Sequence, residues 1–153
     1  MLQNAIHMKR AIFFILFSIP LAFFGQDLQC KDFLEGKFVG TTPQFPGVEW
    51  IILRTQNSQK EWPSVIPKKY KDLGYPTDTI YTNIKQLDNC NYRFLYDEEK
   101  MILNSSGKEM NNSGGLFVKK IKIEGRCYFY ESKTRFNGND LTIKGKICKS
   151  IEH

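Results

Sequence analysis

The sequence predicts an all-β protein: an antiparallel meander of about eight strands closed as a small barrel, with a two-sheet β-sandwich as the alternative. Three observations predict this class. Short runs that alternate apolar and polar residues recur along the chain, and turn-forming dipeptides separate neighbouring runs. After the N-terminal segment, helical periodicity is absent apart from one turn at residues 30–34.

The N-terminal segment has the plan of a secretory signal peptide. Lys9 and Arg10 precede the apolar run 11–25, and polar sequence begins abruptly after it. The run is shorter than the roughly 20 residues that a membrane-spanning helix needs. We therefore expect cleavage after Gly25, so that the exported chain begins at Gln26. The alternative is a segment retained as a membrane anchor.

Residues 26–153 are predicted to form a single domain. Removing residues 1–25 leaves 128 residues, enough for a hydrophobic core, and lowers the net charge from +6 to +4, because the segment carries two basic residues and no acidic one. This charge is ordinary for a soluble protein. We expect no nucleic-acid partner, and contact with a membrane only during export.

Eight segments have the alternation and the turn boundaries of strands. In chain order they are residues 36–42, 48–55, 58–62, 80–87, 90–97, 116–123, 126–132 and 141–149. Short turns at 57–58, 88–89, 124–125 and 137–138 join four pairs of them, and longer loops cover 63–78 and 100–115. Neighbouring strands joined by short turns pair antiparallel, which gives the predicted meander.

The dipeptide Asn137-Gly138 fixes the register of the last hairpin. Asn-Gly is a strong signal for a two-residue turn, because both positions need a positive φ. A turn there places Cys127 opposite Cys148, at a non-hydrogen-bonded position where the two Cα atoms approach closely. The same register puts opposite charges on the cysteine face and apolar residues on the other face, an arrangement that a slip of one residue would destroy.

The four cysteines predict two disulfides and an oxidising compartment. An even number of cysteines behind an export signal is typical of secreted or periplasmic proteins. The hairpin register pairs Cys127 with Cys148, which leaves Cys30 to pair with Cys90. Closing the hairpin loop in this way stabilises the fold by roughly 3 kcal/mol in the chain-entropy model.

Two resemblances agree with this picture. The segments CKDFLEGKF, WIILR, LDNCNYRFLY and IKGKICKS resemble a group of short secreted bacterial proteins of unknown function, which implies export and a β-meander and supplies no activity. A fainter resemblance is to lipocalins, in which a short helical turn leads to Gly-x-Trp on the first strand of an eight-stranded barrel. Here Gly36-Lys37-Phe38 matches, with phenylalanine in place of tryptophan, and the later Thr-Asp-Tyr signature is missing.

The sequence offers little for catalysis. The only histidines are His7 and His153, so Ser-His-Asp and Cys-His arrangements are not expected. The acidic residues 97–99 are interpreted as a solvated turn rather than paired catalytic carboxylates, and residues 137–140 as a hairpin turn rather than a calcium site. The cysteines lack the paired spacing of zinc ligands. We expect a protein that is not an enzyme and uses no metal or cofactor.

Two surfaces are candidates for binding. Aromatic residues of two strands, among them Tyr92 and Tyr130, are expected to face the barrel interior, where their hydroxyls suit a cavity better than a dry core. If residues 124–125 form a two-residue turn, Lys119 lies opposite Tyr130 on that face. An ammonium there needs a partner, a ligand or water, or else the strand has a bulge that shifts the register. The other surface is an outward row of lysines, Lys120, Lys122, Lys144 and Lys146.

The sequence therefore predicts an exported binding module. In the first reading it binds a small, partly apolar ligand or an envelope component, using Lys119, Tyr92 and Tyr130. In the alternative reading it has no internal ligand and contacts an anionic envelope surface through the lysine row. The sequence leaves the ligand and the oligomeric state open.

Overall fold

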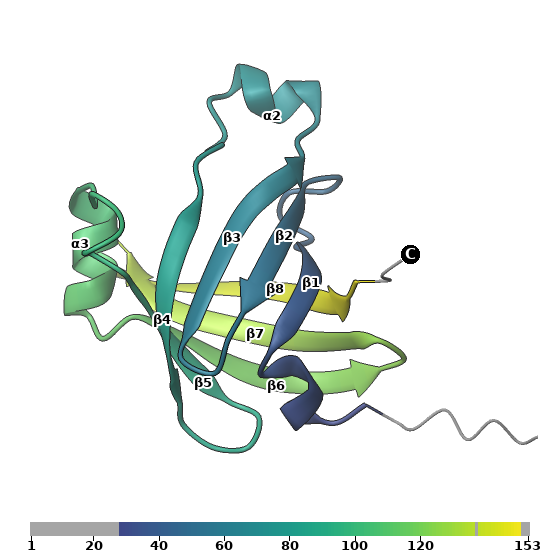
Figure 1. Cartoon of the computed structure of the whole chain (residues 1–153). Coiled ribbons are helices and arrows are strands. Elements are labelled where there is room, and N and C mark those ends of the chain that lie inside the picture. The colour runs from purple at the N-terminus through teal and green to yellow at the C-terminus, as the bar shows by residue number, and fades with distance from the viewer. Residues whose placement is uncertain (1–27, 137, 151–153) are drawn as a thin grey trace, which may run out of the picture.

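The computed structural model describes residues 28–136 and 138–150 (Figure 1). Eight antiparallel strands follow one another around a closed barrel, and the first strand pairs with the last. Closure confirms the predicted meander barrel and rules out the sandwich. The predicted signal peptide 1–25 and its cleavage position, Gly25 and Gln26, lie outside the described residues.

All eight predicted strands are present. They are β1 (Gly36–Thr41), β2 (Glu49–Arg54), β3 (Ser58–Val65), β4 (Ile80–Gln86), β5 (Tyr92–Tyr96), β6 (Leu116–Glu124), β7 (Cys127–Phe136) and β8 (Asn139–Lys149). The predicted turn at the N-terminal end of the barrel is the 3-10 helix η1 (Cys30–Phe33). Each strand therefore forms where period-two alternation lies between turn residues.

Two short helices were not predicted, and both lie in the long loops. Helix α2 (Lys68–Asp72) has only five residues and buries none of them. Helix α3 (Ser105–Asn112) buries only Gly107 and Met110, and the Asn104 side chain caps it by accepting a hydrogen bond from the Gly107 N–H at 2.9 Å. Helices this short, with so few buried residues, leave no readable helical period in the sequence.

The register of the last hairpin is confirmed. Strands β7 and β8 pair from Cys127 opposite Cys148 to Phe136 opposite Asn139, and the two cysteines form a disulfide with a Cα–Cα distance of 4.0 Å. Of the two turn residues, Asn137 lies outside the described residues, while Gly138 has the expected positive φ of 74°. The second predicted disulfide, Cys30–Cys90, is also present.

The apolar face of this hairpin is buried only along part of its length. Tyr128, Ser132 and Ile147 are buried as expected, but Leu141 near the tip is 40% exposed. The neighbouring strands explain the difference, because β6 pairs with β7 only as far as Lys133 and β1 pairs with β8 only as far as Lys146. The tip of the hairpin therefore projects beyond the barrel wall.

The predicted position of Lys119 is wrong. The turn between β6 and β7 is at Gly125-Arg126, one residue later than expected, and a bulge between Lys120 and Lys122 shifts the register again. As a result Lys119 lies opposite Glu131 and is exposed on the outside of the barrel. The same shift places Lys120, expected in the outward row, opposite Tyr130.

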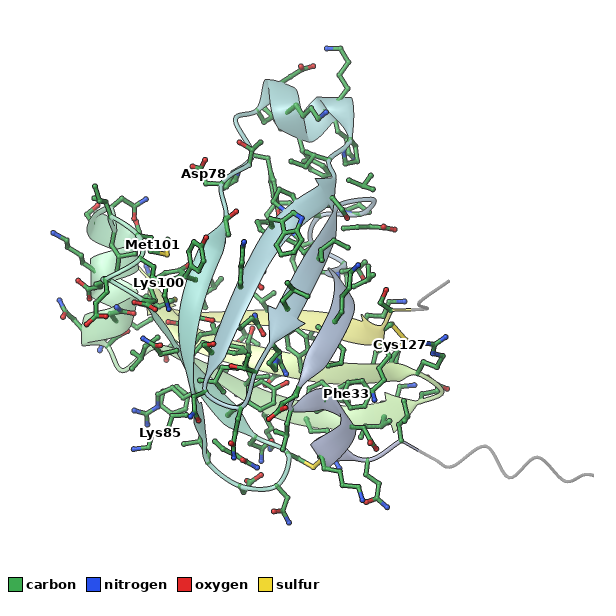
Figure 2. All side chains as sticks on the ribbon, viewed as in Figure 1. Phe33, Asp78, Lys85, Lys100, Met101 and Cys127 are labelled. Atoms are coloured by element: carbon green, nitrogen blue, oxygen red, sulfur yellow. A yellow bond between two sulfur atoms is a disulfide. The ribbon has the colours of Figure 1, made fainter. Side chains whose placement is uncertain are left out.

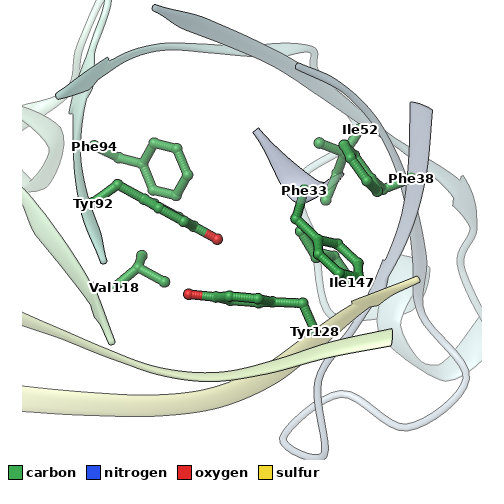
Figure 3. Close-up of a cluster of buried hydrophobic side chains, with 8 residues drawn as sticks. All are labelled: Phe33, Phe38, Ile52, Tyr92, Phe94, Val118, Tyr128 and Ile147. Atoms are coloured by element: carbon green, nitrogen blue, oxygen red, sulfur yellow. The ribbon is translucent and has the colours of Figure 1, made fainter. Parts of the chain in front are cut away.

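One end of the barrel is closed by η1. The Phe33 ring is fully buried and packs against Phe38 and Tyr128, with ring centroids 5.8 and 5.5 Å apart (Figure 3). The Cys30–Cys90 disulfide joins η1 to the turn between β4 and β5 at the same end (Figure 1). The loops that carry α2 and α3 lie away from η1, toward the other end of the barrel (Figure 1).

Candidate ligand-binding cavity

A cavity of about 200 Å³ lies inside the barrel and opens at the end that carries α2 and α3. Most of its wall is apolar, and α3 contributes Met110 to it. The wall also includes charged, amide and hydroxyl side chains from several strands. The lining comprises Gly40, Thr41, Thr42, Trp50, Ile52, Arg54, Gln59, Glu61, Thr82, Tyr92, Phe94, Tyr96, Met110, Leu116, Val118, Tyr130, Ser132, Ile143 and Ile147.

Arg54 forms part of the cavity floor. It is the last residue of β2, is only 6% exposed, and its Nη1 donates to the carbonyl oxygen of Phe33 at 2.9 Å and to the Tyr92 hydroxyl at 3.1 Å. Its guanidinium also lies 4.8 Å from the centroid of the Tyr92 ring and 5.4 Å from that of Phe94. These contacts join the strand wall to the helix that closes the barrel.

A hydrogen-bonded chain runs from Arg54 toward the opening. Arg54 Nε donates to Gln59 Oε1 at 2.8 Å, and Gln59 Nε2 donates to Glu61 Oε2 at 2.9 Å. Gln59 and Glu61 share one face of β3, since side chains two positions apart point the same way. The amide of Gln59 thus separates a buried cation from a carboxylate.

Glu61 is the acidic residue of the cavity lining. Burial raises its pKa to about 6, while the nearby Arg54 charge and the hydrogen bond from Gln59 act in the opposite direction. Its side chain keeps some accessible surface, because it faces the cavity rather than packed protein. Glu61 is therefore largely ionised at pH 7 and largely neutral at pH 5.

The upper wall presents hydroxyls. Burial is the main cause of the raised pKa values of Tyr96 and Tyr130, so both phenols stay neutral and able to donate. Thr82 is only 5% exposed, and its Oγ1 has no hydrogen-bond partner among the described residues. An unpaired buried hydroxyl costs free energy unless a ligand or water satisfies it.

Aromatic rings frame one side of the opening. Trp50 Nε1 donates to the Tyr75 hydroxyl at 3.3 Å, and the Phe45 ring packs edge-on against Tyr70 and Tyr75 at 5.7 and 5.0 Å. Tyr70 belongs to α2, whereas Phe45 comes from the loop between β1 and β2. These contacts hold the two loops together beside the entrance.

The structure separates the three predicted binding residues. Tyr130 lines the cavity wall and Tyr92 its floor, but Lys119 lies outside the barrel. The charged residues of the interior are instead Arg54 and Glu61, which the sequence reasoning missed. The alternation of strand 49–54 placed Arg54 on the face of Trp50 and Ile52, but Ile51 and Leu53 make the other face equally apolar, so the pattern did not identify the inward side.

The acidic turn after β5 lies away from this cavity. Asp97 is buried, and its Oδ2 forms an ion pair at 2.8 Å with Nζ of Lys100, which is labelled in Figure 2. This ion pair and neighbouring backbone N–H groups hold the pKa of Asp97 below its usual value. Within residues 28–136 and 138–150 there is no group of three or more potential metal ligands. No helix in the same part of the chain is long and apolar enough to cross a bilayer.

Comparison with known proteins gives the chain no relative: no protein-family model, no curated protein sequence and no solved structure matches it.

Proposed function

We propose that this chain is an exported, disulfide-bonded barrel that binds a small, partly apolar ligand in its cavity without transforming it. The observation that carries the proposal is the open cavity itself, whose wall is mostly apolar but includes Arg54, Glu61 and the unpartnered Thr82 hydroxyl. Ligand pockets typically combine an apolar lining with a few polar groups that orient the ligand. The cavity is smaller than the roughly 300–1,000 Å³ of pockets for drug-sized molecules, which favours a small ligand.

The arrangement of the polar groups favours binding over catalysis. Arg54 and Gln59 are engaged in fixed hydrogen bonds, and the Ser132 hydroxyl donates to the carbonyl oxygen of Ile143 at 3.2 Å. A nucleophile would need a base within hydrogen-bond reach to activate it. The cavity groups instead form a rigid set of donors and acceptors.

Two features support export to the periplasm or beyond the cell. Both disulfides persist only in an oxidising compartment. The second is the charged-then-apolar N-terminal segment. A lipocalin-like role is part of the same proposal, since an eight-stranded up-and-down barrel with one closed end suits the carriage of a single small ligand.

Filling the cavity tests this proposal. In the variant Ile143→Trp an indole ring projects into the cavity near its opening, whereas Thr142→Trp places the same ring on the outer face of the same strand. We expect indole, used as a small apolar probe with one N–H donor, to bind the wild type and Thr142→Trp alike. Binding to Ile143→Trp should be at least about tenfold weaker, because the site is occupied. Isothermal titration calorimetry measures all three.

Equal binding of indole by the two tryptophan variants would place the probe outside the barrel and contradict the proposal. Native mass spectrometry of gently purified protein gives an independent check. A small molecule that co-purifies with wild type and Thr142→Trp but not with Ile143→Trp would support the cavity as the natural site.

A second candidate function rests on a groove outside the barrel. The groove has a volume of about 510 Å³ and lies between the loop after β1, which supplies Pro43 and Pro46, and the outer face of β6 to β8. Phe129 lies within it, with Lys122 Nζ at 4.9 Å and Lys146 Nζ at 6.0 Å from the centroid of its ring. Three lysines around an apolar floor, Lys122, Lys144 and Lys146, favour an anionic envelope surface.

Charge reversal tests this second function. We expect the double variant Lys144→Glu/Lys146→Glu to bind vesicles of equal parts phosphatidylglycerol and phosphatidylcholine at least about tenfold more weakly than wild type, since each basic residue near such a surface contributes about 1 kcal/mol. The matched control is Lys60→Glu/Lys85→Glu on the exposed surface of β3 and β4 (Figure 2 for Lys85). Equal weakening in both variants would mean that net charge alone, not the groove, drives binding.

A further inference from the structure

Two opposite charges share the cavity without touching each other. Arg54 and Glu61 come from the neighbouring strands β2 and β3, and Gln59 bridges them. Among the described residues, no nitrogen of Arg54 lies within 4.0 Å of a carboxylate oxygen. A buried cation is normally compensated by direct contact with an anion, but here the neutral Gln59 amide stands between the two charges.

Each charge also has an unused hydrogen-bonding atom. Arg54 Nη2 and the second carboxylate oxygen of Glu61 have no partner among the described residues. Neither is among the fully enclosed unpartnered atoms of that part of the chain, which are Thr82 Oγ1, Arg93 Nε and Thr134 Oγ1. Both side chains line the cavity, which is the space from which a ligand would reach these atoms.

The amide of Gln59 shows what fits between them. Its oxygen accepts from Arg54 Nε and its nitrogen donates to Glu61, with the two amide atoms about 2.3 Å apart. Nε and Nη2 lie on the same edge of the planar guanidinium. A ligand that carries an acceptor and a donor at a similar spacing can therefore lie beside the Gln59 amide and join the two free atoms in the same way.

We propose that the cavity binds an amino acid with an apolar side chain as its zwitterion, the carboxylate on Arg54 Nη2 and the ammonium on Glu61. This assignment rests on the proposed function and names its ligand class. In an amino acid one carbon separates the carboxylate from the nitrogen, so the opposite charges have a spacing close to that of the amide.

The remaining wall suits the side chain of such a ligand. Beyond the polar floor the lining is aliphatic and aromatic, including Ile52, Ile147, Leu116 and Met110. A cavity of about 200 Å³ accommodates a molecule the size of leucine. A simple carboxylate would leave Glu61 unpaired beside a second anion, and a simple amine would leave Arg54 unsatisfied.

The charged surroundings of Glu61 determine how binding depends on pH. The titratable groups that influence it are Arg54 on β2, Tyr75 on the loop after α2, Tyr96 on β5 and Tyr130 on β7. The pKa values of the three tyrosines are raised, so these stay neutral between pH 5 and 8, and Arg54 stays charged. Glu61 is then the group that titrates in this range, and its anion is the form that pairs with an ammonium.

Leucine and two analogues that keep its branched side chain test the assignment by calorimetry on the full exported chain. They are leucine, 3-methylbutylamine, which lacks the carboxylate, and 4-methylpentanoate, which lacks the ammonium. At pH 7.5 leucine should bind at least tenfold more tightly than either analogue. Its affinity should fall about tenfold between pH 7.5 and pH 5, because only about one tenth of Glu61 is ionised at the lower pH.

Substitutions of Glu61 and Arg54 test whether these residues bind the ammonium and the carboxylate of the ligand. Glu61→Gln should weaken leucine binding at least tenfold at pH 7.5, remove its pH dependence and leave 4-methylpentanoate unaffected or bound more tightly. Glu49→Gln, an exposed position at the start of β2, is the matched control and should change nothing. Arg54→Lys should weaken leucine and 4-methylpentanoate but not 3-methylbutylamine. If Arg54→Lys fails to fold, as thermal unfolding would show, the Glu61→Gln result still tests the assignment of an amino-acid ligand.

The outcomes separate the two proposals. If indole binds inside the barrel while leucine and its analogues bind alike or not at all, the amino-acid assignment is wrong and the cavity remains a site for another small ligand. The assignment is equally wrong if Glu61→Gln behaves as Glu49→Gln does. If neither indole nor leucine distinguishes Ile143→Trp from Thr142→Trp, the proposed function itself fails.

Discussion

Replacing Phe33 with alanine is expected to lower the free energy of unfolding by about 3–5 kcal/mol. The Phe33 side chain closes the lower end of the barrel, is fully buried, and packs against the rings of Phe38 and Tyr128. Its removal leaves a hole that rigid strands cannot collapse to fill, so lost apolar burial and the new cavity both destabilise the fold. Urea unfolding followed by tryptophan fluorescence measures the change.

Phe117→Ala is the matched control for this variant. Phe117 is 38% exposed on the outside of β6, where it packs under the guanidinium of Arg93 with 4.4 Å between that group and the centroid of the ring. Its loss should cost about 1 kcal/mol, mainly that of an exposed cation–π contact. If the two variants were equally stable, Phe33 would not be part of the core, and η1 would not act as the closure of the barrel.

The strands and the last hairpin were predictable because their signals are local. Period-two alternation and turn dipeptides identify a strand without knowledge of the rest of the fold. In the hairpin, the Asn-Gly turn, the cysteine pair and the apolar face all require the same register, which the pairing of Cys127 with Cys148 confirms. The second disulfide then followed by elimination.

The bulge in β6 could not be predicted from the local sequence pattern. A bulge adds one residue to one strand, so every later side chain of that strand moves to the opposite face of the sheet. The apolar and polar pattern of the sequence does not reveal this change. In the segment LFVKKIKI, lysines and apolar residues fit either face around Lys120 and Lys122. The turn also lies one residue later than expected, at Gly125, but that change moves the register by two residues and keeps each side chain on its face, so it is the bulge that places Lys119 outside.

The polar interior was missed because it depends on three strands at once. Gln59 and Glu61 lie two residues apart and therefore share one face of β3, but a strand face that carries polar residues is usually assigned to solvent. Only the closed barrel places that face inward, opposite the ring of Tyr92 and beside Arg54. A buried polar set of this kind is a local conflict between sequence and fold, and such conflicts are expected at functional sites.

Removing the disulfide between Cys30 and Cys90, by changing both to serine, is expected to cost about 4 kcal/mol of unfolding free energy in the chain-entropy model. The two cysteines are 60 residues apart in sequence, so the bond restricts a long loop in the unfolded chain. It also holds η1 against the turn after β4, where the Tyr128 hydroxyl donates to the carbonyl oxygen of Cys90 at 2.6 Å. Non-reducing urea unfolding measures the loss.

The matched control is the double serine variant at Cys127 and Cys148, whose loop of 21 residues should cost about 3 kcal/mol. The two variants should lose similar amounts of unfolding free energy, but they should differ in which segment of the chain becomes loose. Without the Cys30–Cys90 bond, η1 keeps only noncovalent contacts such as that of Arg54 Nη1 with the Phe33 carbonyl, so limited proteolysis should cleave near residues 30–35. The control should resist cleavage there, because its barrel end stays closed. Protection of residues 30–35 in both variants would mean that packing of Phe33 alone holds the barrel shut.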